Sequence, residues 1–162
     1  MITVIVSAVA FLPRPSNAVP LPGYLDFCVS GVGKLYHAHA TLVINVNGSS
    51  FSVPANVGSG GCMRVIHTHA VDGELHIEPD EDKGRDYTLG DFFLIWGNWE
   101  NNAVRATFNG TQIFGGRVDA SHSLTVTIND SVDPRPDPEN ITLPKTGGSP
   151  FNIVITYGPA AA

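Results

Sequence analysis

Residues 34–58 of the chain read KLYHAHATLVINVNGSSFSVPANVG, and they carry its clearest structural signal. Two runs in which apolar and polar residues alternate flank the dipeptide Asn47-Gly48. Alternation with a period of two is typical of a β-strand with one buried face, and Asn-Gly fits a two-residue hairpin turn. The stretch therefore predicts a β-hairpin that turns at Asn47-Gly48.

Strand patterns continue on the C-terminal side of this hairpin. Residues 62–78 predict a second hairpin, which turns at Asp72-Gly73. Further strand-like runs, VRATFNGTQIFGG, SLTVTIND, ITLP and FNIVITYG, lie within residues 104–158. Together these runs predict a protein built mainly from short antiparallel strands.

One segment, TLGDFFLIWGNW, breaks the β pattern. It predicts a short helix over about residues 88–96, because Thr88 can cap the helix, Asp91 can complete the capping box and Gly97 can end it. We therefore expect a mainly β fold, an antiparallel β-sandwich or barrel with this one short helix.

The composition restricts the classes of function. The 162 residues are 43% hydrophobic, which suits one packed domain, and we place that domain at residues 24–162. Charged residues make up only 15% and the net charge is −6, so the chain has no basic surface for nucleic acid. No apolar run reaches the roughly 18 residues of a transmembrane helix. We expect neither a nucleic-acid partner nor a transmembrane helix.

The first 23 residues have a composition of their own. Residues 1–12 are uncharged and rich in β-branched side chains, which predicts a strand buried on both faces, and residues 13–23 form a Pro-rich connector. A terminal strand on such a tether can complete the sheet of the next copy, so that a filament grows head to tail. An ordinary first strand or an unprocessed signal peptide is the alternative. The donor strand would consist of Ile2, Val4, Ile5, Val6, Val9 and Phe11.

Cysteines and glycosylation sequons favour a secreted protein. The two cysteines, Cys28 and Cys62, permit a single disulfide. N-x-S/T sequons occur more often than chance predicts for this composition, and they begin at Asn47, Asn109, Asn129 and Asn140. With the low charge content, these features indicate an extracellular or cell-surface glycoprotein. A cytosolic protein rich in Asn and Thr turns is the alternative.

Five of the six histidines fall in strand-like segments. Side chains alternate across a strand, so His37 and His39 share one face, and His67 and His69 share another. Whether the two pairs come together depends on which strands are neighbours, and residue parity does not settle this.

The predicted second hairpin places further ligands beside His67 and His69. A two-residue turn at Asp72-Gly73 pairs His69 with His76 and His67 with Glu78. Directly opposed residues have Cβ atoms about 5 Å apart, so two imidazoles can bind one ion. The candidate metal ligands are His37, His39, His67, His69, His76 and Glu78.

Clustered imidazoles suit Zn or Cu(II), and three or four nitrogens are enough for a site. Cu(I) is less favoured because the chain has only two methionines. In a regular strand Cys62 would face away from His67 and His69, so we expect it in a disulfide with Cys28 rather than on the metal. The alternative is a histidine face that binds nothing or that responds to protons.

Other signals are weaker. Gly61, the His67-x-His69 pair and Glu74 match the opening of the cupin motif, but its closing glycine and its second motif are missing. The acidic loop at residues 80–86 resembles a calcium loop without the EF-hand's Gly and Glu. His122 lies apart in sequence from the other five histidines, and we expect it to be a surface residue. No nucleophile or general-base constellation is present, so we do not expect an enzyme.

Five blocks, YHAHATLVINVNG, VPANVG, C-x4-HTH, DGELHIE and YTLGDFFLIWG, resemble in this order a family of uncharacterised secreted domains of archaea and bacteria. Some members are lipid-anchored or membrane-tethered. The resemblance covers roughly residues 28–158, and both cysteines and all six candidate ligands match its polar blocks. It implies an extracytoplasmic protein with a metal site and no known reaction. One position departs, because the family usually has Asp where Ala70 follows the HTH block.

The sequence thus predicts a secreted metal-binding structural protein, a subunit of an extracellular filament joined by N-terminal strand exchange. The metal would be Cu(II) or Zn, and the partner would be another copy of the same chain. The alternative is a monomeric extracellular metal-handling protein or a cupin-like metalloenzyme.

Overall fold

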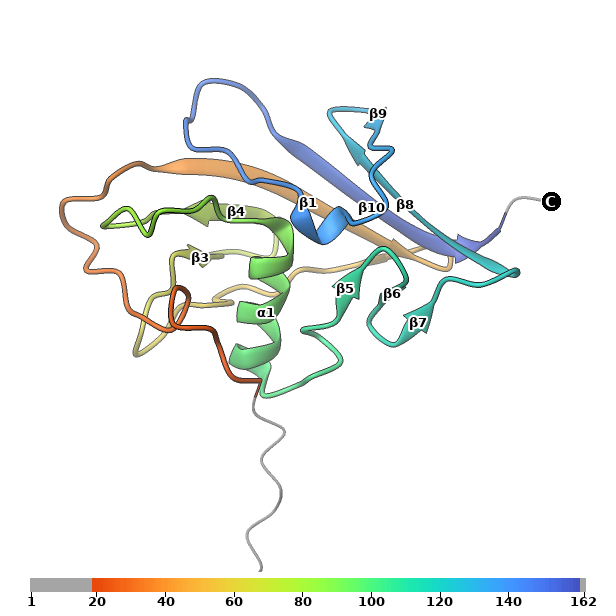
Figure 1. Cartoon of the computed structure of the whole chain (residues 1–162), viewed down its shortest axis with the longest axis horizontal. Helices are drawn as coiled ribbons and strands as arrows, with labels where there is room; N and C mark the ends of the chain where they lie inside the picture. Colours follow the sequence, from red (N-terminus) through yellow and green to blue (C-terminus); the bar gives the residue numbers. More distant parts are fainter. Residues whose placement is uncertain (1–18, 161–162) are drawn as a thin grey trace, which may run out of the picture.

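The structure, a computed structural model, describes residues 19–160. The predicted donor strand at residues 1–12 lies outside the described residues. Within residues 19–160 the chain forms one α-helix, α1 (Leu89–Glu100), one 3₁₀ helix, η1 (Pro138–Asn140), and ten strands (Figure 1). The strands are β1 (Ala38–Val46), β2 (Ser49–Phe51), β3 (Ile66–His67), β4 (Glu74–Ile77), β5 (Phe108–Asn109), β6 (Gln112–Ile113), β7 (Gly116–Arg117), β8 (His122–Ile128), β9 (Ser131–Val132) and β10 (Asn152–Pro159).

Seven of the strands form one large sheet. Their order is β3-β4-β1-β10-β8-β9, and β2 pairs with β1. β1 and β10 run parallel, and the other neighbours are antiparallel. The strands β5, β6 and β7 form a small antiparallel sheet. The predicted mainly β fold with one short helix is confirmed, and within it the large sheet stays open.

The first hairpin forms as its sequence predicts. Asn47 and Gly48 have φ angles of 51° and 78°, the positive values that a two-residue hairpin turn needs. Val46 of β1 then lies opposite Ser49 of β2. Burial alternates along β1 with a period of two, so one face of this strand is buried and the other faces outward.

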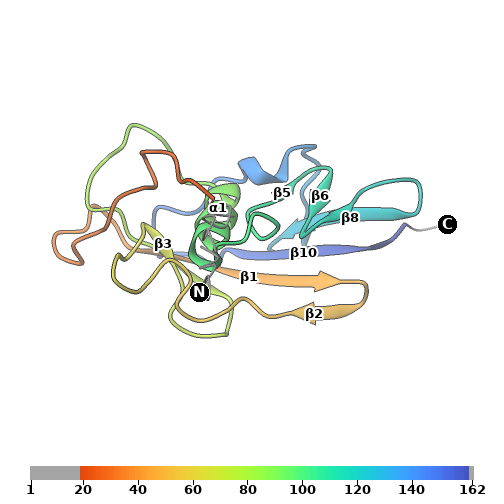
Figure 2. The ribbon, with the colours of Figure 1, turned by 90° about the horizontal axis from the view of Figure 1, so that it is seen from below.

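One face of the large sheet carries the core. Helix α1 and the small sheet lie against that face (Figure 2). Alternate side chains of β1 pack there, and α1 contributes its largest apolar side chains. The fully buried residues of these two elements include Ala38, Ala40, Leu42, Ile44, Phe92, Phe93, Ile95 and Trp96. The opposite face of β1 therefore presents its polar side chains outward.

The helix begins where the sequence predicts and ends later. Thr88 caps it, and Asp91 completes the predicted capping box. The predicted end at Gly97 is wrong, because α1 continues to Glu100 and ends at Asn101, whose φ is 54°. A Cβ atom on Gly97 would lie 2.4 Å from the Cβ of Ala106, so this glycine allows close packing within the helix instead of ending it.

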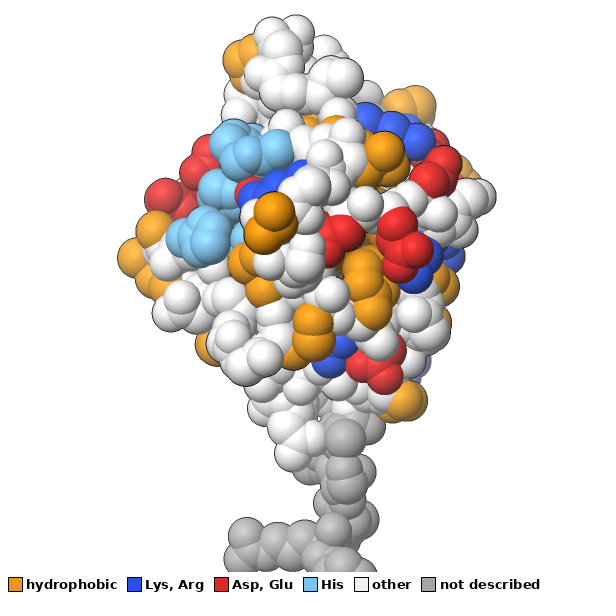
Figure 3. Space-filling model, turned by 90° about the vertical axis from the view of Figure 1, so that its left-hand side faces the viewer, with side chains coloured by type: hydrophobic (Ala, Val, Ile, Leu, Met, Phe, Trp, Pro, Cys, Tyr) orange, Lys and Arg blue, Asp and Glu red, His pale blue; other side chains and the backbone are white. Residues whose placement is uncertain are grey.

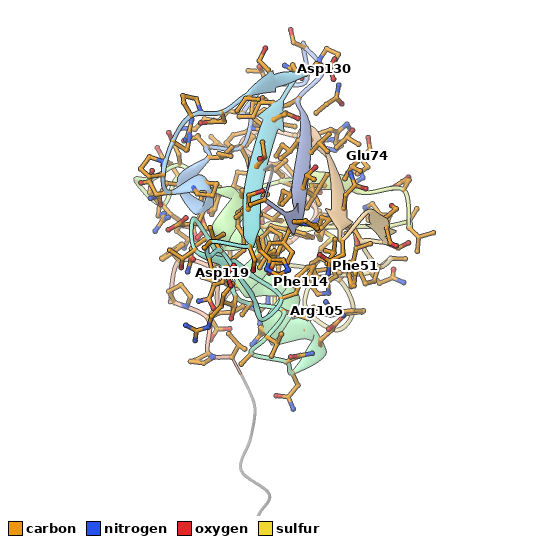
Figure 4. All side chains as sticks on the ribbon, turned by 90° about the vertical axis from the view of Figure 1, so that its right-hand side faces the viewer. Phe51, Glu74, Arg105, Phe114, Asp119 and Asp130 are labelled. Carbon is orange, nitrogen blue, oxygen red and sulfur yellow. A yellow bond between two sulfur atoms is a disulfide. The ribbon has the colours of Figure 1, made fainter. Side chains whose placement is uncertain are left out.

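Behind the end of α1, Arg105 is held by aromatic rings and a carboxylate. Its guanidinium lies 4.4 Å from the ring centroid of Phe51 and 4.6 Å from that of Phe114 (Figure 4). Its Nε donates to Glu100 Oε2 at 3.1 Å, and Glu100 Oε1 accepts from the indole of Trp96 at 2.8 Å. These contacts join the helix end to β2 and to the turn after β6.

The second hairpin forms with a different register. His67 lies opposite His76 rather than Glu78, so the predicted pairing of His69 with His76 is wrong by two residues. The reason is Thr68, whose backbone N–H donates to Val57 O and whose hydroxyl donates to Pro54 O. The segment at residues 54–57 thus takes Thr68 away from β4, and residues 68–73 become a longer connection.

Two further findings bear on the setting of the protein. Cys28 and Cys62 form a disulfide, as the sequence predicts. Within residues 19–160, no helix has both the length and the apolar character that crossing a membrane requires.

Candidate metal centre

Three neighbouring strands place three histidines in one row. His39 of β1 lies opposite His76 of β4, and His76 lies opposite His67 of β3. Opposed residues in antiparallel strands point to the same face of the sheet, so the three rings are neighbours. The ring centroids lie 4.5 Å apart for His39 and His76 and 5.4 Å apart for His67 and His76.

The remaining candidate ligands flank this row. His37 precedes His39 by two residues and Glu78 follows His76 by two, so both share the face of the row. His69 lies in the connection after β3, with its ring centroid 4.5 Å from that of His76. All six predicted ligands therefore come together on the face of the sheet away from α1, and Figure 3 shows the histidines as one patch bordered by acidic side chains.

The cluster contains two groups of three imidazoles that share His76. We call His37, His39 and His76 the outer triad, and His67, His69 and His76 the inner triad. Within each triad one nitrogen from every ring lies within 4.8 Å of the others. Within residues 19–160, these are the groups of three metal-ligating side chains that lie this close together.

Distances in the outer triad are near those of a bound ion. His37 Nε2 lies 3.3 Å from His76 Nδ1, and two nitrogens on a tetrahedral Zn are about 3.3 Å apart when each is 2.0–2.1 Å from the metal. His39 Nε2 is closer to His37 Nε2, at 2.7 Å. Glu78 Oε1 lies 2.9 Å from His37 Nε2 and 3.8 Å from His76 Nδ1, so it can supply a fourth ligand.

The inner triad contains a buried nitrogen that has no partner. The His67 side chain is fully buried, and its Nδ1 lies 2.9 Å from the backbone carbonyl of Arg64. A carbonyl can only accept, so Nδ1 carries the proton and Nε2 keeps a lone pair. Nε2 has no hydrogen-bond partner, and its nearest charged neighbour is Glu78 Oε2 at 4.0 Å. Metal-binding histidines commonly donate one ring N–H to a backbone carbonyl in this way, which leaves the other nitrogen free to bind the metal.

Charge and burial favour the protonation states that bind a metal. Burial lowers the pKa of His67 from 6.5 to about 4, and burial together with the charge of His39 lowers the pKa of His76. Burial alone would raise the pKa of Glu78, but the hydrogen bond and charge of Lys34 outweigh it and hold that pKa below 4.5. At neutral pH both imidazoles are therefore neutral and the carboxylate is ionised.

Two charged neighbours of the cluster are absent from the predicted set of ligands, although Glu74 appears in the cupin-like motif. Lys34 forms an ion pair with the buried Glu78. Glu74 lies with its Oε1 3.5 Å from His39 Nδ1 and its Oε2 3.5 Å from His76 Nε2. The parity of Glu74 matches that of His76, so its position was predictable. Lys34 precedes β1 in an irregular segment, where the sequence gives no such signal.

A groove of ≈ 300 Å³ opens beside the outer triad. His39, Thr41 and Glu74 line one side, and the glycine-rich segment at residues 147–152 lines the other. The His39 side chain therefore lies beside space for a small ligand.

The other predicted sites lie apart from the cluster. His122 is half-exposed, stacks on Tyr157 with ring centroids 5.5 Å apart, and belongs to neither triad. The loop at residues 80–86 brings no three carboxylates together, so the structure gives the calcium prediction no site among the described residues. Among the sequon asparagines, Asn47, Asn129 and Asn140 are exposed and Asn109 is half-buried.

Comparisons with protein-family models, with curated proteins and with solved structures give no match to this chain. The chemistry of the cluster is therefore inferred from its own geometry.

Proposed function

We propose that the protein is a secreted metal-binding structural protein and that its histidine cluster binds Cu(II) or Zn. The observation that carries this proposal is the buried Nε2 of His67, which is aimed at the other ligands and has no hydrogen-bond partner. An unpaired buried polar atom costs about 1–3 kcal/mol, and a bound ion removes that cost. A metal therefore gives a physical reason for a feature that otherwise only destabilises the fold.

The donor set selects the class of metal. Imidazole nitrogens with one carboxylate suit Zn and Cu(II), whereas Ca²⁺ and Mg²⁺ require oxygen ligands. The disulfide leaves both cysteines without a thiolate to offer. The absence of thiolates from the cluster disfavours the softer Cu(I).

Calorimetric titration of metal-free protein with Cu(II) and with Zn tests the proposal. We expect micromolar or tighter binding that is lost in the double variant His39→Ala, His76→Gln. The histidine outside both triads provides the matched control, since His122→Ala should bind as the unchanged protein does. Tight binding that survives the double variant, or binding that His122→Ala removes, contradicts the assignment.

The structural part of the proposal is a filament in which residues 1–12 add a strand to the next copy. Its support is the apolar, uncharged composition of those residues. A terminal strand of this kind can add to the sheet edge of another chain.

Electron microscopy tests the filament directly. We expect uniform filaments from the full-length chain and separate particles when residues 1–12 are replaced by a Gly/Ser segment of the same length. Metal binding serves as the control in both chains, because it should be unchanged by the replacement. A full-length chain that stays monomeric at high concentration contradicts the filament and leaves the metal site standing.

The groove beside His39 favours one alternative, a monomeric metal-handling protein or metalloenzyme. Such a protein needs an open coordination position next to space for a small ligand. Azide, a small anion that changes the visible spectrum of accessible Cu(II), distinguishes the cases. A coordinatively closed structural site predicts no spectral change, and a large change favours the alternative.

A further inference from the structure

We propose that the cluster binds two metal ions at once and that His76 bridges them through both of its ring nitrogens. The inference rests on the proposed metal binding and adds its stoichiometry and the role of one residue. It begins from the strand order, because His76 lies in the middle strand of the row and is the one ligand that the two triads share.

The two nitrogens of His76 face opposite ends of β4. Nδ1 lies 3.3 Å from His37 Nε2 and 3.8 Å from Glu78 Oε1, at the end that carries the outer triad. Nε2 lies 3.5 Å from Glu74 Oε2, at the other end. Residues 68–73 connect His67 to Glu74, so His69 also lies at that end. Nδ1 therefore faces the outer triad, and we assign the other nitrogen, Nε2, to the inner triad.

The rings on the two sides of His76 are arranged alike. His37 and His67 lie nearly parallel to the His76 ring, with centroids 5.6 Å and 5.4 Å away and interplanar angles of 28° and 14°. His39 and His69 meet it edge to face, both at 4.5 Å, with angles of 70° and 73°. Each side therefore supplies one stacked and one edge-on imidazole, which is a three-nitrogen site on either side of one shared ring.

Glu78 lies at the outer-triad end of β4 and approaches one ligand of each triad. Its side chain is 4% exposed, with Oε1 2.9 Å from His37 Nε2 and Oε2 4.0 Å from His67 Nε2. A carboxylate with one oxygen towards each triad offsets part of the repulsion between two divalent ions. Glu74 adds a second negative charge beside His39 and His76.

The protons balance without any change of oxidation state. A neutral His76 has one protonated nitrogen and one lone pair, so it binds the first ion through the lone pair. When the second ion binds, the remaining ring proton passes to solvent and the freed lone pair coordinates that ion. Binding of the second ion therefore releases one proton, which can be measured.

Copper titration with electron paramagnetic resonance tests the bridge on the metal-free full-length protein. We expect two Cu(II) per chain by elemental analysis after dialysis against glycine, which removes weakly held copper. Two Cu(II) ions joined by an imidazolate couple antiferromagnetically, so at low temperature the integrated signal should account for well under half of the bound copper. One proton should be released with the second ion.

Variants that remove ligands from only one of the two triads test the bridge further. His69→Ala changes an exposed residue of the inner triad, and it should leave one Cu(II) per chain with its full signal. The pair His37→Ala, His39→Ala should do the same from the outer side, and His122→Ala should keep two coupled ions. One copper per chain in the unchanged protein, or two coppers with full signal, overturns the bridge while metal binding stands. No bound copper overturns the bridge, and it overturns metal binding as well when the calorimetric titration also shows no bound Zn.

Discussion

At the scale of the residue, an unpaired buried polar atom gains meaning from its surroundings. His67 Nε2 and the Tyr87 hydroxyl are both buried and lack a hydrogen-bond partner. His67 lies beside the imidazoles of His69 and His76, so a metal gives it a role. Tyr87 belongs to neither triad, so its hydroxyl is a cost without a ligand to offset it. The unpaired nitrogen of His67 therefore indicates a metal site, whereas the unpaired hydroxyl of Tyr87 only lowers the stability of the fold.

This contrast predicts the behaviour of Tyr87→Phe. Burial raises the pKa of Tyr87 from 10.0 to about 12, so the fold favours the neutral phenol. A raised pKa contributes stability that is fully present below pH 10 and is lost as the pH rises through 12. Urea unfolding at pH 7 should show Tyr87→Phe equal to or slightly more stable than the unchanged protein. Between pH 10 and 12 the variant should lose less stability, and an equal loss in both contradicts the assignment.

A second residue-scale prediction concerns Lys34, which neutralises the buried Glu78. Lys34→Met leaves that carboxylate without its cation, so the metal-free protein should lose about 1–3 kcal/mol of unfolding free energy. Removing a positive charge beside the cluster should at the same time strengthen Zn binding by about tenfold. Calorimetry and urea unfolding measure the two effects.

The control for Lys34 is Lys145→Met. Lys145 pairs with Asp86 at an exposed position, where solvent screens the pair and leaves it little effect on stability. Its loss should change neither quantity appreciably. Weaker Zn binding by the Lys34 variant is the outcome that would count against a cation site at Glu78.

At the scale of the element, local signals predicted where structure begins better than where it ends. The Asn47-Gly48 turn and the Thr88 cap act within a few residues, so the sequence alone identified both. The helix continues past Gly97, against which Ala106 packs from outside the helix, and it ends at Asn101. The residue pattern does not encode the contact with Ala106, and the predicted helix end at Gly97 is wrong for this reason.

Gly97→Ala tests this account of the helix. Alanine is about 1 kcal/mol better than glycine within a helix, so a position chosen for helix propensity alone would be stabilised. A Cβ at Gly97 would instead meet the backbone nitrogen of Ala106 at 2.6 Å, and overpacking of this kind costs about 1–3 kcal/mol. We expect net destabilisation in urea unfolding. Gly148→Ala is the control, because its Cβ meets nothing within 4 Å, and a stabilised Gly97 variant would contradict the packing role.

The sequence predicts which residues of the candidate site share one face of the sheet, but it does not predict which of them lie opposite each other on neighbouring strands. A shift of register by two residues keeps every side chain on its original face, so the predicted set of ligands survived the error in the second hairpin. The pairs themselves changed because Thr68 bonds to residues 54–57, a contact between segments that the alternation pattern does not encode. Lys34 was missed for the same reason.

At the scale of the whole molecule, strand order joins the two histidine pairs. β4 lies between β1 and β3, so segments about thirty residues apart in sequence meet at His76. The disulfide supports the same arrangement, since Cys28 lies ahead of β1 and Cys62 lies ahead of β3. The disulfide thus joins the segments that precede β1 and β3, the two strands on either side of β4.

This connection predicts that the disulfide and the metal stabilise the same architecture. The bridge spans 34 residues, so its removal in Cys28→Ser, Cys62→Ser should lower the unfolding free energy by about 3–4 kcal/mol in the loop-entropy estimate. Zn at a free concentration 100 times its Kd should restore about 2.7 kcal/mol, because only the folded chain assembles the cluster. Guanidinium unfolding with and without Zn measures both terms. Calcium should restore nothing, since the cluster offers mainly nitrogen ligands, and equal rescue by calcium and Zn would show that the stabilisation does not come from the histidines.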